Sequence, residues 1–253
     1  LGVEPVLPPE GRLYQRLIAL DDEEATDIAE EHANEHGLLA LHQDVVIPAL
    51  GLAEQDRHRG VIDEARERFV FDTVRRIIDE VEDRKAIKEE AQRKAEEGDA
   101  KPAVAPAPKP PASRAAAALC IVAAHDEADH LAGLALARLV PHNEFDAQVI
   151  DFPVLAGEVA EKVAACGAKI VCISALPPQA TIQAGYLAKR LKQRLPELKI
   201  AVVLWTAGNT EKAQVRLRAS GVDEVATSVS AAVERLRQLA GPLAAASENA
   251  APM

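Results

Sequence analysis

The sequence predicts an α/β protein, built from an N-terminal helical bundle followed by a doubly wound parallel sheet. Three observations predict this organisation. Residues 1–97 repeat their apolar positions at steps of three and four, which is the period of amphipathic helices. Residues 98–115 are dominated by Pro, Ala and Lys. Beyond them, short apolar runs alternate with helical patterns, as in parallel sheets with crossover helices.

Four helices are expected in the N-terminal part. They are predicted at 13–20, 21–37, 38–60 and 69–81, the last continuing into charged residues without apolar positions. The second begins with an acidic run that suits a helix N-terminus, and the second and third end at the glycines Gly37 and Gly60. Short connections between amphipathic helices predict a four-helix bundle over residues 1–97.

The segment 98–115 is predicted to be an extended, semi-rigid linker, because Pro-rich chains cannot bury apolar surface. It should leave two thermodynamically separable halves, each with its own core. The α/β domain is expected over 116–240, and the Ala-rich residues 241–253 are expected to be a disordered tail. Its strands are predicted at 118–125, 149–152, 169–176, 199–206 and 223–227. Strands and helices in this alternation imply a flavodoxin-like sheet of order 2-1-3-4-5.

Composition narrows the classes of function. The 253 residues carry a net charge of -11, which argues against nucleic acid or an anionic membrane surface as partner. The 3 cysteines are odd in number, and two of them lie in strand-like runs, which predicts buried thiols in a reducing cytosol. We find no run of about 18 apolar residues that could span a membrane and no signal peptide. Because the chain opens on Leu1 without an initiator Met, we expect a fragment of a longer protein.

Titratable side chains are concentrated in the loop after the first predicted strand. The loop holds His125, Asp126, Glu127, Asp129 and His130 within six residues, directly before a helical pattern. Open parallel sheets bind ligands beyond the carboxyl ends of their strands, where the strand order reverses. The sequence therefore predicts a ligand site at this loop.

The neighbouring strand ends add further candidates. The expected ligand-binding residues are His125, Asp126, Asp129, His130, Gly133, Ser174, Leu176, Trp205 and Thr206. Structural explanations are also open for several of them. Asp126 and Asp129 are suited to cap a helix. Trp205 can serve as packing, and Ser174 can bond to its own backbone.

Other chemistries fit the pattern less well. A phosphoacceptor receiver has the same topology, but Ser174 stands where its carboxylate nucleophile is required and Thr227 stands near the place of its lysine. His32 and His36 share a helix face and could share a metal ion, although no cysteine lies nearby. No G-x-S-x-G motif supports a hydrolase. We therefore expect no catalytic residue and no metal.

A helical bundle followed by such an α/β domain resembles the cobalamin-binding modules of methyltransferases and light-sensing regulators. Here His130 and Gly133 match the D-x-H-x-x-G motif of that family, whose His coordinates cobalt from below, and Ser174 and Leu176 match its S-x-L motif. The sequence departs from the family at Ala128, Leu204-Trp205, Arg57 and Glu67-Arg68. The bulk of Trp205 in particular opposes binding of the nucleotide tail. The resemblance implies the fold, with no cofactor expected and with cobalamin, coordinated by His130, as an alternative.

A second resemblance covers nearly the whole chain. Several short sequence segments are similar to the region that follows the membrane domain in autoinducer-2 exporter family proteins. They lie at 4–9, 13–17, 47–50, 53–60, 126–129 and 172–178. This resemblance implies a permease-like transporter, with this region at the cytoplasmic face of the bacterial inner membrane and the membrane domain of the same parent chain as its partner. Self-association into a homo-oligomer is also open.

Together these observations predict a non-catalytic sensory or regulatory module that binds a small ligand or a partner at the carboxyl ends of strands one, three and four. A corrinoid-binding module is one alternative. A module that only assembles the parent protein is the other.

Overall fold

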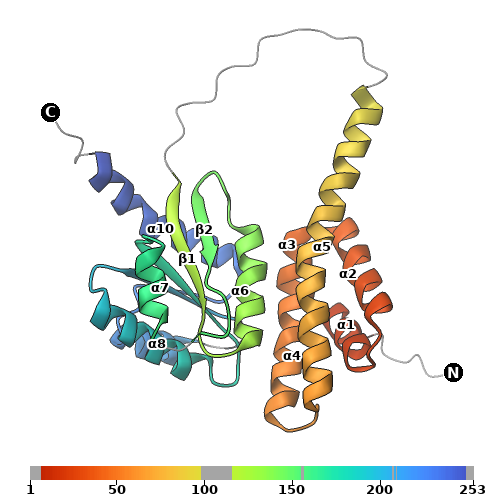
Figure 1. Cartoon of the computed structure of the whole chain (residues 1–253), viewed down its shortest axis with the longest axis horizontal. Helices are drawn as coiled ribbons and strands as arrows, with labels where there is room; N and C mark the ends of the chain where they lie inside the picture. Colours follow the sequence, from red (N-terminus) through yellow and green to blue (C-terminus); the bar gives the residue numbers. More distant parts are fainter. Residues whose placement is uncertain (1–6, 98–115, 155–156, 207, 209, 249–253) are drawn as a thin grey trace.

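The computed structural model describes residues 7–97, 116–154, 157–206, 208 and 210–248 (Figure 1). A helical bundle and an α/β domain lie side by side. The linker predicted at 98–115 falls outside the described residues, as do 1–6 and 249–253. Among the described residues, no helix is long and apolar enough to cross a membrane.

In the described part of the chain, the bundle consists of four helical rods, numbered here in chain order and each made of one continuous stretch of helix, as the sequence predicts. Three of them are α1 (Pro9–Ile18), α2 (Asp22–His36) and α5 (Glu64–Glu97). The side chain of Asp21 accepts a hydrogen bond from the backbone N–H of Glu24 and so caps α2. Gly37 ends α2 with a φ of 88°, a conformation that a side chain would disfavour.

The remaining rod, which is the third along the chain, is continuous but changes from α-helix to π-helix and back. It comprises α3 (Leu38–Ala40), a π-helical turn η1 (Leu41–Val46) and α4 (Ile47–His58). Pro48 lies at the second position of α4, where it has no N–H to donate and where its ring would meet the preceding turn of a regular helix. The wider π turn accommodates the proline, and such turns occur frequently at functional sites.

The α/β domain has the predicted parallel sheet of order β2-β1-β3-β4-β5. Its strands are β1 (Ala117–Ala123), β2 (Phe145–Val149), β3 (Ile170–Ala175), β4 (Lys199–Leu204) and β5 (Glu224–Ala226). Its helices are α6 (Glu127–Leu139), α7 (Val159–Ala165), α8 (Ala180–Arg194), α9 (Glu211–Ala219) and α10 (Val229–Glu248).

Besides shifts of a few residues at element ends, two segments differ from the sequence prediction. The second strand was expected at 149–152 but spans Phe145–Val149, because its signal is the alternation of buried and exposed residues on an edge strand rather than an apolar run. The tail expected to be disordered from residue 241 instead continues α10 as far as Glu248. Ala is the strongest helix former, so an Ala-rich segment readily extends a helix that is already formed.

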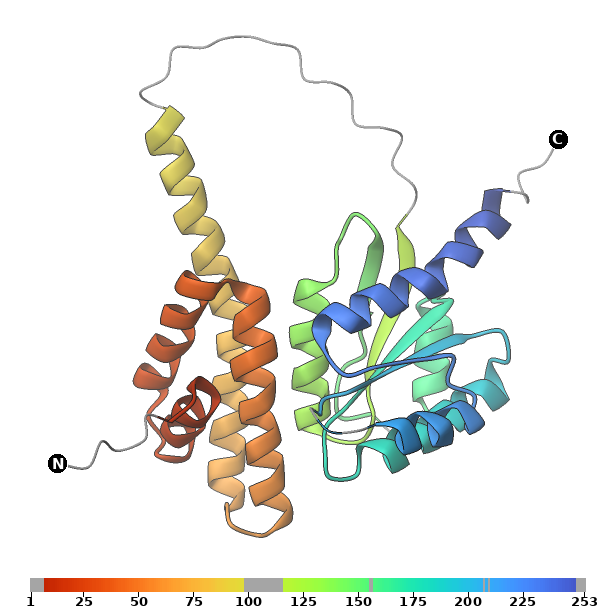
Figure 2. The ribbon, with the colours of Figure 1, turned by 180° about the vertical axis from the view of Figure 1, so that it is seen from behind.

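The core joins the two halves of the chain, contrary to the expectation that each half has its own. One face of the sheet packs on α7, α8 and α9. The other face, through Leu119 and Ile121, belongs to a single apolar cluster with α6, α10 and the bundle helices. Figure 2 shows α6 between the bundle and the sheet. Residues 128–133, at the start of α6, are all buried, so every side of this helix is covered there.

Candidate functional site

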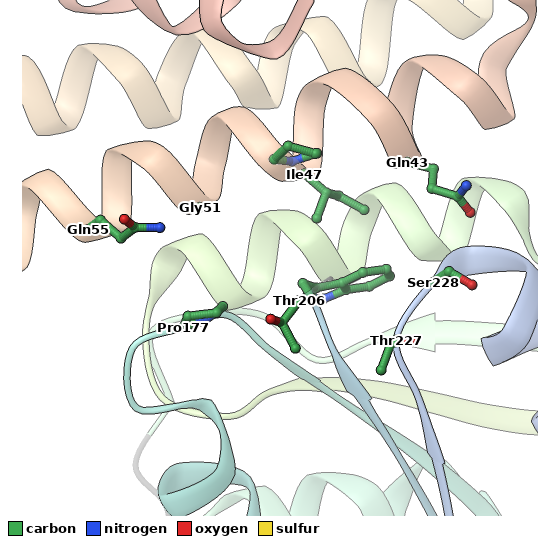
Figure 3. Close-up of a pocket in the computed structure, with 10 residues that line it drawn as sticks. Gln43, Ile47, Gly51, Gln55, Pro177, Thr206, Thr227 and Ser228 are labelled. Carbon is green, nitrogen blue, oxygen red and sulfur yellow. The ribbon is translucent and has the colours of Figure 1, made fainter. Parts of the chain in front are cut away.

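A cavity of about 350 Å³ lies between the bundle and the carboxyl ends of β3, β4 and β5 (Figure 3). The described residues that line it are Gln43, Ile47, Pro48, Gly51, Gln55, Pro177, Trp205, Thr206, Thr227 and Ser228. This volume falls at the lower end of the range typical of small-molecule sites. The position agrees with the rule that open parallel sheets bind ligands beyond the carboxyl ends of their strands.

A stripe along the third rod forms the bundle side of the cavity. Gln43, Ile47, Gly51 and Gln55 are spaced four residues apart, so they share one helix face. Figure 3 shows this stripe running past the strand ends, with Gln55 and Pro177 toward one end. A Cβ added at Gly51 would meet only Leu176 Cδ2, at 3.8 Å. Because alanine would fit there and glycine weakens a helix interior, the glycine keeps space open at a cost to helix stability.

Gln43, which lines the cavity, has a buried hydrogen-bond acceptor that no donor contacts. Its Oε1 is buried and has no hydrogen-bond partner, while its Nε2 donates to Asp44 Oδ1 at 3.4 Å. A buried acceptor that lacks a partner costs about 1–3 kcal/mol, so such atoms are uncommon in folded proteins. A ligand that supplies an N–H or O–H group would remove this cost.

Trp205 closes the sheet side beneath the cavity. Its indole Nε1 donates a hydrogen bond of 2.8 Å to Ser174 Oγ, and its side chain is almost completely buried. Behind Ser174, a Cβ added at Gly133 would lie 3.1 Å from Ile121 Cγ2 and 3.5 Å from Ser174 Cβ. Gly133 and Ser174 therefore serve the close packing of α6 on the sheet and do not reach the cavity.

A charged cluster lies beside the cavity, where α4 meets the loop after β1. Glu54 is only 2% exposed; it accepts hydrogen bonds from Arg57, and its Oε1 lies 2.8 Å from His58 Nε2. Arg57 Nη2 also donates to Asp126 Oδ2 at 2.9 Å, which links the bundle to the α/β domain. Burial, and then the charge of Glu54, raise the pKa of Asp126.

The same cluster is the one group of three potential metal ligands among the described residues. Ligand atoms of Glu54, His58 and Asp126 lie within 4.8 Å of one another. Arg57 Nη2 contacts both carboxylates, and His58 Nε2 lies 3.5 Å from it. The guanidinium thus holds the position that a metal ion would take, and it supplies the cation that the two acids require. His32 and His36 have ring centroids 4.6 Å apart, and no third described ligand joins them.

Asp129 fastens the loop after β1 to the end of β3. Its carboxylate accepts backbone N–H groups from His125 at 3.0 Å and from Leu176 at 2.6 Å. Asp126 and Asp129 also form a reciprocal capping box at the start of α6. Burial, and then the nearby charge of Asp126, raise the pKa of Asp129, against the lowering effect of the N–H donors. The structural explanation of these two acids, as helix caps, is therefore borne out by the geometry.

His130 lies on a different side of α6 from the cavity. It is buried, its ring centroid is 6.2 Å from that of Phe152, and it bonds to the backbone of Ile150 beyond β2. Burial, and then the charge of Arg75, lower the pKa of His130, which favours the neutral imidazole. Its Nδ1 has no partner.

The nine residues predicted to bind ligand therefore do not form a single site. Trp205 and Thr206 line the cavity, whereas His125, Asp126 and Asp129 lie at the charged cluster with Leu176. The sequence prediction missed the residues that complete the cavity, which are Gln43, Ile47, Pro48, Gly51, Gln55, Pro177, Thr227 and Ser228. Signals for some of them were present: a glycine and a proline inside one helix, and glutamines spaced along its apolar face.

Buried His42, in the π turn, predicts a measurable pH dependence of stability. Burial, and then the charge of Arg138, lower its pKa from 6.5 to about 4. The folded state then binds the proton more weakly than the unfolded chain, so the contribution of His42 is complete above pH 6.5 and is lost as the pH falls toward 4. Its full extent is about 3 kcal/mol.

Urea unfolding of wild type and His42→Gln, measured between pH 7 and 4, tests this prediction. The difference in unfolding free energy should shift in favour of the variant as the pH falls, while the exposed-site control His142→Gln should follow wild type. A constant difference across this range would show that His42 titrates normally.

Comparisons with known proteins give no family for this chain. No protein-family model matches the chain, and no curated protein matches it in sequence. In structure it is similar to a cobalamin-binding protein from Desulfitobacterium hafniense, with 12% identity over 92% of this chain and 98% of that one, at a TM-score of 0.42. It is also similar to the methanol:cobalamin methyltransferase complex from Methanosarcina barkeri, with 14% identity over 94% of this chain and 80% of that one, at a TM-score of 0.35. Likenesses at this level leave the ligand to be inferred from the chain's own residues.

Proposed function

We propose that this chain is a non-catalytic module that binds a small ligand in the cavity between the bundle and the α/β domain. The observation that carries the proposal is the buried, unpartnered Oε1 of Gln43 beside a cavity of about 350 Å³. Gly51 supports it, because that position keeps space open at a cost to helix stability. Both features weaken the empty protein, and a bound ligand would compensate for the first of them.

The lining favours binding over catalysis. The described residues around the cavity carry amide, hydroxyl, indole and aliphatic groups, and none of them titrates near neutral pH. The carboxylates of the predicted site are instead held in the Arg57 cluster and the helix cap, and His130 is bonded to the backbone of Ile150. A general acid or base must lie within hydrogen-bond reach of the reacting group, and the cavity lining provides neither.

Filling the cavity tests the proposal. We expect that at least one compound in a library of charged and uncharged metabolites raises the melting temperature of wild type but not of Gly51→Phe, whose ring would occupy the cavity. At about 100 times Kd, binding adds about 2.7 kcal/mol, or roughly 5–10 °C for a chain of this size.

Gly51→Ala is the matched control, since its methyl group meets only Leu176 Cδ2 at 3.8 Å. It should retain the ligand response and melt slightly higher than wild type, by the equivalent of up to about 1 kcal/mol. Equal responses in wild type and Gly51→Phe would place binding elsewhere, and no response in any protein would exclude this function.

Corrinoid binding is the second candidate, and His130 Nδ1 is the observation that favours it, because this buried nitrogen has no partner. The surrounding residues do not fit the cofactor in this arrangement. His130 bonds to Ile150 near β2 rather than facing the cavity, and Trp205 fills the space beside Ser174. We therefore expect no corrin absorbance to co-elute with the protein on gel filtration after mixing with hydroxocobalamin. Co-elution in wild type, lost in His130→Ala, would make this the better function.

As the partner, we propose the membrane domain of the same parent chain. Binding of ligand to this module would then change the transport rate of that domain. The support is the resemblance of sequence phrases to the autoinducer-2 exporter family. In the full-length parent protein, Gly51→Phe should then abolish any ligand-dependent change in transport while leaving its ligand-free rate unchanged. A transport rate that the ligand does not affect in wild type would argue against this role.

A further inference from the structure

We propose that the ligand of this cavity is an uncharged nitrogen heterocycle, held by an N–H group that donates to Gln43 Oε1. This inference rests on the proposed function and specifies the chemistry of the same site.

Charge disfavours phosphorylated and carboxylated ligands. The described lining residues contain no cation that could balance an anion in the cavity. Arg57 lies two positions beyond Gln55 but is bound to Glu54 and Asp126. The whole chain carries a net charge of -11, which repels anions further. An unpaired charge would also have to be desolvated on entry, at a cost that a small site cannot recover.

The hydrogen-bonding groups call for a donor on the ligand. Gln43 Nε2 donates to Asp44 Oδ1 at 3.4 Å, and the carbonyl oxygen of the same amide is left as an acceptor without a partner. Ser228 and Thr227 line the same cavity as Gln43 (Figure 3), so two hydroxyl groups belong to its wall. A hydroxyl can both donate and accept. This set is complementary to a ring that carries an N–H donor next to an acceptor.

The remaining walls favour a flat, largely apolar body. Ile47 and Pro48 lie on the bundle side, and Pro177 and Trp205 lie on the sheet side. The polar edge of the indole is already bonded to Ser174, so Trp205 contributes apolar surface to the cavity. A cavity of about 350 Å³ holds the volume of about a dozen water molecules. A heterocycle of nucleobase size fits this volume, with any further substituent at the open mouth.

The experiment measures binding of matched neutral and charged probes. Adenosine and guanosine are the neutral heterocycles, AMP and GMP are their charged counterparts, and ribose and glucose are the neutral sugars. We expect calorimetric titration of wild type to detect at least one neutral heterocycle, with the corresponding monophosphate at least tenfold weaker and the sugars undetected.

Gln43→Met tests the assigned contact, because methionine keeps the volume and removes the acceptor. Affinity for the neutral heterocycle should fall about tenfold, as expected for one lost hydrogen bond. The melting temperature of the free protein should not fall, since an unpaired buried acceptor has been removed. Gln193→Met, at an exposed position of α8, is the matched control and should change neither quantity.

Several results would overturn the inference. Monophosphates that bind as tightly as the nucleosides, sugars that bind alone, or an affinity unaffected by Gln43→Met would each do so. If a charged compound binds wild type and Gly51→Phe abolishes that binding, the cavity is still a ligand site and only its proposed chemistry is wrong. If nothing binds wild type, both the inference and the proposed function fail.

Discussion

The isolated α/β domain, residues 116–240, is expected to unfold without a cooperative transition. Residues 128–133 of α6 are buried on every side of the helix, and the sheet can cover only one of those sides. The bundle covers the other, and its apolar side chains belong to the same cluster as those of α6. Each large apolar side chain newly exposed costs about 1.5–3 kcal/mol, against a typical total stability of 5–15 kcal/mol.

Thermal unfolding followed by near-ultraviolet circular dichroism, together with dye binding, measures this loss. The truncated protein should retain helical and strand signals, lack a sharp transition and bind 1-anilinonaphthalene-8-sulfonate, as states without fixed tertiary packing do. Full-length protein under the same conditions is the control. A sharp transition in residues 116–240 would restore the view, suggested by the Pro-rich linker, that the halves are separable.

The sheet could be predicted from sequence because parallel strands buried on both faces leave apolar runs that are hard to mistake. β1, β3 and β4 were found for this reason, and the order of all five strands is confirmed. β2 was misplaced because it lies at the sheet edge, where an alternating pattern is a weaker signal. The shared core was missed because apolar periodicity shows that a helix face is buried but does not show what covers it.

The candidate site was harder to predict, because its two sides come from distant parts of the chain. Sequence reasoning gave most weight to titratable residues after β1, yet Asp126 and Asp129 cap α6 and hold the loop in place. Gln43 and Gly51 give only weak signals in the sequence, and the packing of the third rod over the strand ends is what gives them a role. Trp205 was expected either to bind ligand or to serve as packing; it lines the cavity, and its indole is bonded to Ser174.

Replacing Arg57 by methionine is expected to destabilise the full-length protein by about 3 kcal/mol. Its guanidinium is the cation shared by Glu54, which is 2% exposed, and Asp126. Methionine would fill part of the space and leave Glu54 and Asp126 without the cation that lies between them. Removing one member of a buried ion pair costs about 3–5 kcal/mol, and the lower end applies because 27% of the Arg57 side chain is exposed.

The melting temperature should therefore fall by roughly 6–12 °C, as measured by calorimetry at pH 7. The loss should shrink as the pH is lowered toward 4.5, because protonation of Asp126, whose pKa is already raised, removes the repulsion. Arg59→Met is the matched control, since 68% of that side chain is exposed and its ion pair with Asp56 is 3.6 Å long; its effect should stay within about 0.5 kcal/mol.

The same variant separates an arginine-centred cluster from a metal site. With Arg57 in place, neither chelation by EDTA nor added Zn²⁺ should change the melting temperature of wild type, because the guanidinium already contacts the carboxylates of Glu54 and Asp126. In Arg57→Met the ligand atoms of Glu54, His58 and Asp126, which lie within 4.8 Å of one another, lose that cation, and Zn²⁺ should restore part of the lost stability. The opposite outcome is that Zn²⁺ stabilises wild type and that His58→Ala abolishes this effect. A metal ion would then displace Arg57, and the cluster would be a metal site.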